Sequence, residues 1–379
     1  MKIDRIEVHL LSCPVDGIVN WKSATGRATK KDLVLVEIIT DEGVIGWGEA
    51  HHALCPPVVS EIITEAYAPL LIGKDPLQIN ELTSRLFKMG KMLGTNGAPV
   101  AAISGVEIAL WDIAGKVAGL PVYKMLGAYS DRVRAYAGGW SLGWNEDVGA
   151  LIEEAQAMVE YGYTAVKMRV GQSVKHDVRC VKALREALGD DIDILTDAAG
   201  SYDRVQARYV VDAFQDLGVY WLEEALPMTD IEGLIELSHA RKVRIAYGES
   251  FYTRYPFTRP IAEKGIDVVQ PDVSKCGGIL EAKIIAGMAE SWNIPFAPHI
   301  VANAVATAAN LQLAGSIRNA LIVEIEMPTT AVFRESLVTD PSAFVMENGD
   351  ILIPQGPGLG IEIDRDALRK FPYIAGSCY

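Results

Sequence analysis

The sequence has little positive charge. Its 379 residues include 35 lysines and arginines against 49 aspartates and glutamates, which gives a formal net charge of −14. Nucleic acids and anionic membrane surfaces are bound by basic faces, so this balance argues against both as partners. A small anionic substrate remains compatible with the charge, because a bound metal ion can reverse its sign locally.

Long hydrophobic runs and paired cysteines are also missing. No apolar run is long enough to span a bilayer, and the N-terminal MKIDRIEVHL alternates charged and apolar residues where a signal peptide would have an apolar core. The five cysteines are scattered and odd in number, which is typical of a reducing compartment and not of a disulfide framework. We therefore expect a cytoplasmic protein.

The pattern of elements changes along the chain, although no linker or low-complexity segment divides it. The first 50 residues alternate like three antiparallel strands, and segments with helical spacing follow, so we predict an α+β domain over residues 1–127. Residues 128–344 then alternate strand and helix, which predicts a β/α barrel, and residues 345–379 are expected to return to the first domain. The eight expected barrel strands are VRAYAGGW, TAVKMRVG, IDILTD, VYWLEE, RIAYGE, IDVVQPD, IPFAPH and ALIVEIE.

Acidic residues close three successive strand-like segments at equal intervals. Asp197, Glu223 and Glu249 are separated by 26 residues in both steps. A strand, a loop and a covering helix take about this many residues, so the three acids are expected at equivalent strand ends. In a β/α barrel these ends meet at one mouth, where barrel enzymes have their active sites. Asp272 and His299 close the next two segments and are expected in the same pocket.

The three acids predict a metal site. One acid alone would be read as a solvated or helix-capping residue. Three neighbouring carboxylates repel one another unless a cation lies between them, and ligation by oxygen alone selects a hard ion such as Mg²⁺. Glu224 follows Glu223 directly, so strand alternation predicts that it points the other way as a structural acid.

Two further sets of residues are candidates for proton transfer. Asp272 beside His299 would fix the imidazole tautomer and stabilise its protonated form, which gives a base that works near neutral pH. Lys167 and Arg169 lie two residues apart on the second strand and therefore share a face. Of these two, only Lys167 can act as a base, because arginine stays protonated.

These residues resemble the enolase superfamily, and within it the mandelate racemase subgroup, over essentially the whole chain. The superfamily is itself a standard example of a lysine or histidine base working with Mg²⁺. The motifs that carry the resemblance are VKMR at 166–169, LTD ending at Asp197, WLEE at 221–224, GES at 248–250, QPD at 270–272 and PH at 298–299.

The resemblance implies a fold, a cofactor and a reaction. The fold would be a modified TIM (β/α) barrel with an N-terminal α+β capping domain, and Asp197, Glu223 and Glu249 would hold Mg²⁺. The reaction would be abstraction of the proton α to the carboxylate of a small substrate, through an enediolate. Lys167 and the His299–Asp272 pair would flank the substrate. Glu324, with Glu326 as the alternative, would hydrogen-bond the substrate carboxylate, and a homo-oligomer is expected because relatives are commonly symmetric oligomers.

Three positions depart from the subgroup pattern. Arg169 stands where a second lysine is usual, Ala199 where asparagine is usual, and Ala225 where the proline of Glu-Glu-Pro is usual. The missing lysine argues against racemisation, which must protonate either face of the intermediate. Arg169 could instead bind substrate oxygens as a fixed cation.

We therefore expect an acid-sugar dehydratase, a lyase that removes water across Cα and Cβ. Either His299 takes the α-proton and returns it to the leaving hydroxyl, or Lys167 takes it and His299 acts as the acid. The alternatives are an isomerase, either a cycloisomerase of an acid-sugar lactone or an epimerase, and a barrel that only binds carboxylates. Substrate choice is expected to come from capping loops such as residues 16–31 and 50–56.

Overall fold

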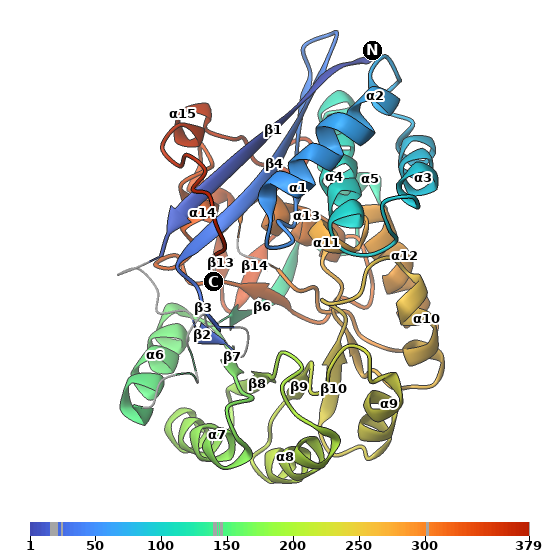
Figure 1. Cartoon of the computed structure of the whole chain (residues 1–379). Coiled ribbons are helices and arrows are strands. Elements are labelled where there is room, and N and C mark those ends of the chain that lie inside the picture. Colours follow the sequence, from blue (N-terminus) through green and yellow to red (C-terminus); the bar gives the residue numbers. More distant parts are fainter. Residues whose placement is uncertain are drawn as a thin grey trace.

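The computed structural model describes residues 1–15, 22–23, 26–138, 142, 144, 147–300 and 303–378. Figure 1 shows a barrel ringed by helices, with the strands of an antiparallel sheet crossing above it. Half of the predicted loop 16–31, namely residues 16–21, 24 and 25, lies outside the described residues, so its role in substrate choice stays a prediction. In the part that is described, no helix is both long and apolar enough to cross a membrane.

The N-terminal sheet has three antiparallel strands in the order β1 (Ile3–Pro14), β4 (Lys30–Thr40) and β5 (Ile45–Ala50). Gly43 closes the β4–β5 hairpin with a φ of 80°, a backbone conformation that glycine adopts without strain. The strand alternation in the first 50 residues predicted this meander, and the prediction is confirmed. A short separate hairpin pairs β2 (Lys22–Ser23) with β3 (Gly26–Arg27).

Helices cover one face of this sheet. They are α1 (Pro56–Glu61), the π-helical turn η1 (Ile62–Tyr67), α2 (Ala68–Leu71), α3 (Ile79–Gly90) and α4 (Ala98–Ala118). The long helix α4 packs on β5 so closely that a Cβ added at Gly48 would lie 1.8 Å from the carbonyl oxygen of Gly105. Glycine at position 48 is therefore what allows the helix and the sheet to meet.

Replacing Gly48 with alanine should lower the free energy of unfolding by about 3 kcal/mol, because the methyl group meets backbone that can move only with the whole helix. Urea denaturation followed by circular dichroism measures this change. Gly287→Ala is a matched control, because Gly287 lies in a helix and a Cβ there has no neighbour within 4 Å. Equal stability of the two variants would contradict the proposed contact.

Within the described residues, the barrel has seven regular parallel strands. They are β6 (Arg132–Gly138), β7 (Ala165–Arg169), β8 (Asp193–Asp197), β9 (Trp221–Glu223), β10 (Arg244–Tyr247), β11 (Val268–Val269) and β12 (Val323–Ile325). Parallel pairing of β12 with β6 closes the ring. The helices around it are α6 (Val148–Tyr161), α7 (Val174–Leu188), α8 (Arg204–Asp216), α9 (Ile231–His239), α10 (Tyr255–Ala262), α12 (Ile279–Glu290) and α13 (Ala304–Ala314).

The seventh predicted strand, IPFAPH, is not a regular strand. Only Phe296 pairs there, in isolated parallel bridges with Val269 on one side and Ala320 on the other. Pro295 and Pro298 flank this position and have no backbone N–H to donate, which shortens the ladder. The eightfold order of the barrel is kept, because the bridges join β11 to the segment that leads into β12.

The barrel interior is filled by a buried cluster that takes one residue from each of the eight strand positions. Its members are Tyr136, Ala165, Leu195, Trp221, Ala246, Val268, Ala297 and Ile322. A filled interior is a packed core and not a pore. Polar side chains that follow this layer along the strands therefore gather at the C-terminal mouth, beneath the capping domain.

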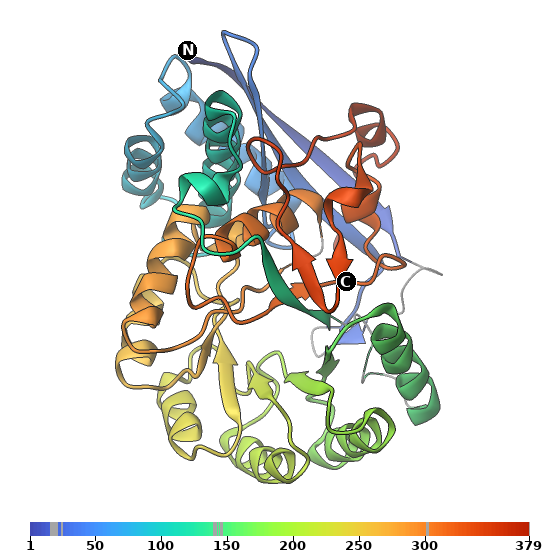
Figure 2. The same cartoon turned by 180° about the vertical axis from the view of Figure 1, so that it is seen from behind.

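The C-terminal residues return to both parts of the molecule. The hairpin of β13 (Met346–Glu347) and β14 (Asp350–Leu352) pairs antiparallel with β6, as Figure 2 shows from behind, and Pro372 bridges to Leu11 of β1. The short helices α5 (Val122–Met125), α14 (Val332–Glu335) and α15 (Arg365–Leu368) complete the chain. The boundaries 1–127, 128–344 and 345–379 stay a proposal.

Two buried acids of the capping domain receive hydrogen bonds from barrel helices. Glu107 of α4 accepts the backbone N–H groups of Ile279, at 2.7 Å, and Leu280, at 2.9 Å, at the start of α12. Glu49 of β5 accepts the N–H of Ala306 at 2.8 Å, at the start of α13, and the side-chain amide of Asn303 at 2.7 Å. The first N–H groups of a helix have no partner within it, so these acids complete both helix starts.

Candidate active site

Three carboxylates meet at the barrel mouth. Asp197 ends β8, Glu223 ends β9 in register beside it, and Glu249 follows β10 by two residues. One carboxylate oxygen from each lies within 4.8 Å of those of the other two. The cluster is buried or nearly so, and its ligand atoms are all oxygen, which fits a hard divalent cation.

Lys167 of β7 lies among these acids. It is 0% exposed, and its Nζ is 3.0 Å from Glu324, 3.3 Å from Glu223 and 3.7 Å from Asp197. Burial opposes its charge, but the carboxylates of Glu223 and Glu324 outweigh burial and raise the pKa of Lys167 above its usual value. These acids therefore favour the charged form of Lys167 in this arrangement.

The imidazole of His299 bridges two acids. Its Nδ1 is 2.9 Å from Asp272 and its Nε2 is 2.9 Å from Glu249. Asp272 is held in turn by the backbone N–H and the hydroxyl of Ser274, at 2.7 and 2.8 Å. Burial works against the charged imidazole, but Glu249 and Asp272 prevail and raise the pKa of His299 to about 10.

Glu324 and Glu326 near the end of β12 have different partners. Glu324 contacts Lys167, and its Oε2 is buried without a hydrogen-bond partner among the described residues. Glu326 instead lies 3.2 Å from Lys31 of β4, in a buried ion pair between the capping domain and the barrel. The structure thus brings Glu324, and not Glu326, into contact with the predicted site residues.

Glu224 departs from the role expected of it. Its φ is 43°, and its buried Oε1 has no hydrogen-bond partner within the described residues, so it is not a fully satisfied structural acid. Burial, reinforced by the nearby Glu249, raises the pKa of Glu224 to about 8. Burial and the neighbouring acid therefore favour the protonated form of this carboxyl.

Lys275 is a functional candidate that the sequence pattern did not reveal. It is 8% exposed, and its Nζ is 3.8 Å from Glu249. It lies on the single-turn helix α11 (Val273–Cys276), whose first turn is capped by Asp272. Lys275 does not lie at a strand end, so the strand-end pattern does not include it. Its place three residues after the strand-end Asp272 is the sequence feature that could have pointed to it.

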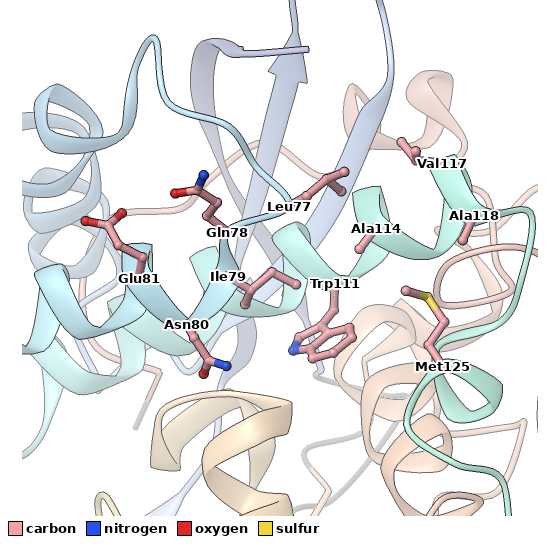
Figure 3. Close-up of a pocket in the computed structure, with 10 residues that line it drawn as sticks. All are labelled: Leu77, Gln78, Ile79, Asn80, Glu81, Trp111, Ala114, Val117, Ala118 and Met125. Atoms are coloured by element: carbon pink, nitrogen blue, oxygen red, sulfur yellow. The ribbon is translucent and has the colours of Figure 1, made fainter.

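A cavity of about 580 Å³ lies apart from this site, between α3, α4 and α5. Figure 3 shows Leu77, Ile79, Trp111 and Met125 around it, all on the capping domain or the segment that leaves it. Its lining has one acid, Glu81, among the described residues. It offers neither a metal-ligand set nor a pair for proton transfer, so we place the chemistry at the barrel mouth.

Comparison with known families agrees with this geometry. Residues 6–127 match the N-terminal domain model of mandelate racemase and muconate lactonizing enzyme, and residues 150–367 match the enolase C-terminal domain-like model. The chain belongs to the mandelate racemase/muconate lactonizing enzyme family. The predicted family and the predicted fold class are both confirmed.

Relatives in this family include sugar-acid enzymes. The chain is 33% identical to a D-galactarolactone cycloisomerase of Agrobacterium fabrum, with 98% of this chain and 99% of the relative covered. It is 32% identical to an arabinonate dehydratase of Saccharolobus solfataricus, with 90% of each covered. Among solved structures, an enolase superfamily member from a Polaromonas species is 35% identical with a TM-score of 0.94, covering 100% of this chain and 99% of that one. A racemase from Streptomyces coelicolor with bound magnesium is 27% identical with a TM-score of 0.89, covering 97% and 99%.

The departures from the family pattern have visible structural counterparts. Arg169, in place of a second lysine, forms an ion pair with Asp197. Ala199 has a φ of 45° and donates its backbone N–H to Asp197 at 2.9 Å. Ala225 is fully buried. The first metal-ligand candidate is therefore held by an arginine and a backbone amide, and neither of these can take a proton from a substrate.

Proposed function

We propose that this family member is a Mg²⁺-dependent acid-sugar dehydratase. It would remove the proton α to the carboxylate of a polyhydroxylated acid and expel the β-hydroxyl as water, and the resulting enol would become a 2-keto acid. The observation that carries the proposal is the order of side chains around the barrel. Lys167 precedes the three acids in strand order and the Asp272–His299 pair follows them.

We assign Mg²⁺ to Asp197, Glu223 and Glu249. Their oxygens are close enough to share one ion, and Glu223 has a buried Oε2 without a hydrogen-bond partner among the described residues. When bound, the ion supplies positive charge that stabilises the negative charge developing on the substrate carboxylate as the α-proton leaves. The magnesium in the Streptomyces coelicolor relative supports this choice of metal.

His299 is the proposed acid of the dehydration step. It would donate the proton that lets the β-hydroxyl leave as water, and Asp272 would stabilise the charged imidazole before that transfer. The α-proton would be taken either by His299 itself or by Lys167 on the other side of the acids. The group that takes it must first lose its own proton, which a cation held by the three acids would favour. Glu324 and Arg169 would bind the substrate carboxylate and orient it, since Glu324 is paired with Lys167 and Arg169 stays protonated.

A cycloisomerase of an acid-sugar lactone is the second candidate. It is favoured by the 33% identity over nearly the full chain to D-galactarolactone cycloisomerase. Both reactions begin with loss of the same α-proton, and they differ in the leaving group, which is a hydroxyl in one and the lactone oxygen in the other. The same side chains could serve either reaction.

Incubation with a panel of acid sugars and their lactones in the presence of Mg²⁺ tests the proposal. A dehydratase gives a product lighter than its substrate by one water, whereas a cycloisomerase or an epimerase gives a product of equal mass. Mass spectrometry separates these results, and NMR in heavy water detects exchange at Cα. A barrel that only binds carboxylates would show neither product nor exchange.

Removal of Mg²⁺ should lower turnover by at least about 10²-fold, because the carboxylate of the substrate would lose its main source of charge stabilisation. Treatment with EDTA, followed by dialysis and a rate measurement, gives the size of the loss. Added Mg²⁺ should restore the rate, and circular dichroism before and after chelation shows whether the fold is kept. Undiminished turnover after chelation would refute the metal assignment.

A homo-oligomer also stays a prediction, which size-exclusion chromatography with light scattering would test.

A further inference from the structure

His51 lies where the capping domain meets the turn that carries the catalytic pair. It directly follows β5, and its backbone N–H donates to the carbonyl oxygen of Ser274 at 3.0 Å. Ser274 in turn donates two hydrogen bonds to Asp272, the partner of His299. The position of His51 is therefore fixed relative to the proposed acid.

Backbone hydrogen bonds set the tautomer of His51 and of its neighbour. The N–H of Ala53 donates to Nδ1 of His51 at 3.1 Å, and the N–H of Leu54 donates to Nδ1 of His52 at 3.1 Å. A ring nitrogen that accepts a hydrogen bond carries no proton, so the proton of each neutral imidazole lies on Nε2. Within the described part of the chain, no residue accepts a hydrogen bond from either Nε2–H.

The turn after the two histidines is strained in a way that produces this arrangement. Ala53 has a φ of 48° and Leu54 a φ of 62°, the left-handed conformation that residues with a Cβ rarely adopt. Strain of this kind persists at binding and catalytic sites where the surroundings impose it. Here it directs two successive amides back at the two rings, which stack with their centroids 4.7 Å apart.

The described surroundings favour the neutral form of both rings and pair the nearby ammonium groups with acids. Burial lowers the pKa of His51 well below its usual value and that of His52 to about 4. The nearby ammonium groups are each close to an acid. Lys275 is 3.8 Å from Glu249, Lys30 is 2.9 Å from Asp32, and Lys31 is 3.2 Å from Glu326. A ligand at His51 would thus meet a neutral N–H donor among balanced charges.

We propose that His51 donates its Nε2–H to a hydroxyl oxygen of the substrate remote from the carboxylate, while His52 holds the ring of His51 by stacking. The inference rests on the proposed function and specifies its substrate class, a monocarboxylate with hydroxyls beyond Cβ. A hydroxyl oxygen accepts from a neutral donor without needing a counter-charge. A second carboxylate in the same place would add a negative charge beside lysines that are already paired with acids, and an alkyl group would leave the donor unsatisfied.

The test compares a five- or six-carbon sugar acid with glycerate, which has a β-hydroxyl and nothing beyond it. His51→Phe keeps the aromatic stack but removes the donor, and should lower kcat/KM for the long acid about 10- to 100-fold more than for glycerate. His51→Gln retains an N–H at similar reach and should recover most of this preference. His239→Leu, at an exposed histidine on the far side of the barrel, is the matched control and should keep the preference of the unmodified enzyme.

Calorimetry on the Mg²⁺-loaded protein gives the same comparison as binding constants, so the inference is tested even if neither acid is turned over. A His51→Phe variant that keeps the preference for the long acid would overturn the inference, whatever its turnover. If that variant fails to fold, monodeoxy sugar acids bound to the unmodified enzyme measure the same contact. One deoxy position should cost about 10- to 100-fold in affinity, and equal affinity across the series would overturn the inference. Failure of the proposed function has a different signature, because then no acid shows exchange at Cα.

Discussion

Replacing His299 with asparagine is expected to lower kcat by about 10²- to 10⁴-fold, the range typical of a lost general acid or base. The imidazole contacts Asp272 and Glu249 at 2.9 Å each, and asparagine has a polar side chain that cannot carry a proton to the leaving hydroxyl. Product formation measured by mass spectrometry gives the loss of turnover. Calorimetric titration should show that Mg²⁺ still binds, because the three proposed ligands are intact.

Two further variants test whether the loss of turnover is specific to the His299–Asp272 pair. Asp272→Asn leaves the imidazole in place but removes the charge that stabilises its protonated form, so its loss of turnover should be smaller than that of His299→Asn. His239→Asn alters a histidine on the outer helix α9 and should have no effect on turnover. Full activity of His299→Asn would rule out the role assigned to this residue.

Replacing Lys167 with methionine is expected to lower the free energy of unfolding by about 3–5 kcal/mol when Mg²⁺ is withheld. Lys167 is completely buried and lies within 3.7 Å of Asp197, Glu223 and Glu324. Without its ammonium group, these carboxylates would face one another in a buried site with Arg169 as the nearest remaining cation. Urea denaturation in EDTA measures the change.

The same variant should gain more stability from Mg²⁺ than the unmodified protein does. The added ion would supply the charge that the lysine no longer provides, so denaturation in Mg²⁺ should reduce the difference between the two proteins. Lys182→Met is the matched control, because Lys182 is an exposed helix residue whose ion pair with Glu186 contributes little. A Lys167→Met variant as stable as this control would show that the buried acids do not depend on the ammonium group.

The fold was predictable because strand-end chemistry repeats at a fixed interval. Asp197, Glu223 and Glu249 each close an apolar segment, and the structure places all three at the mouth of one barrel. The seventh strand was predicted too long, because hydrophobic pattern alone does not show that two prolines remove ladder donors around Phe296. The hydrophobic pattern predicts which segments line the barrel. It predicts less well how many residues of each segment pair with the neighbouring strands.

The sequence pattern did not reveal the roles of Lys275 and His51, because these roles depend on turns and on contacts between domains. Lys275 reaches Glu249 from a one-turn helix that has no periodic signal. His51 falls within loop 50–56, but its donor nitrogen follows from the Ala53 amide in the strained turn, and its position follows from its backbone hydrogen bond to Ser274. Spacing along the sequence carries little information about either, because both depend on tertiary contacts.

Glu49 and Glu107 affect how this protein could be recombined with its relatives. They complete the first turns of α13 and α12, the helices that follow His299 and Asp272. A chimera joining this barrel to the capping domain of another family member would therefore need an acceptor at both positions, whatever its loops contribute to substrate choice. Grafting single loops onto the existing capping sheet avoids that requirement, which makes it the safer route to a changed specificity.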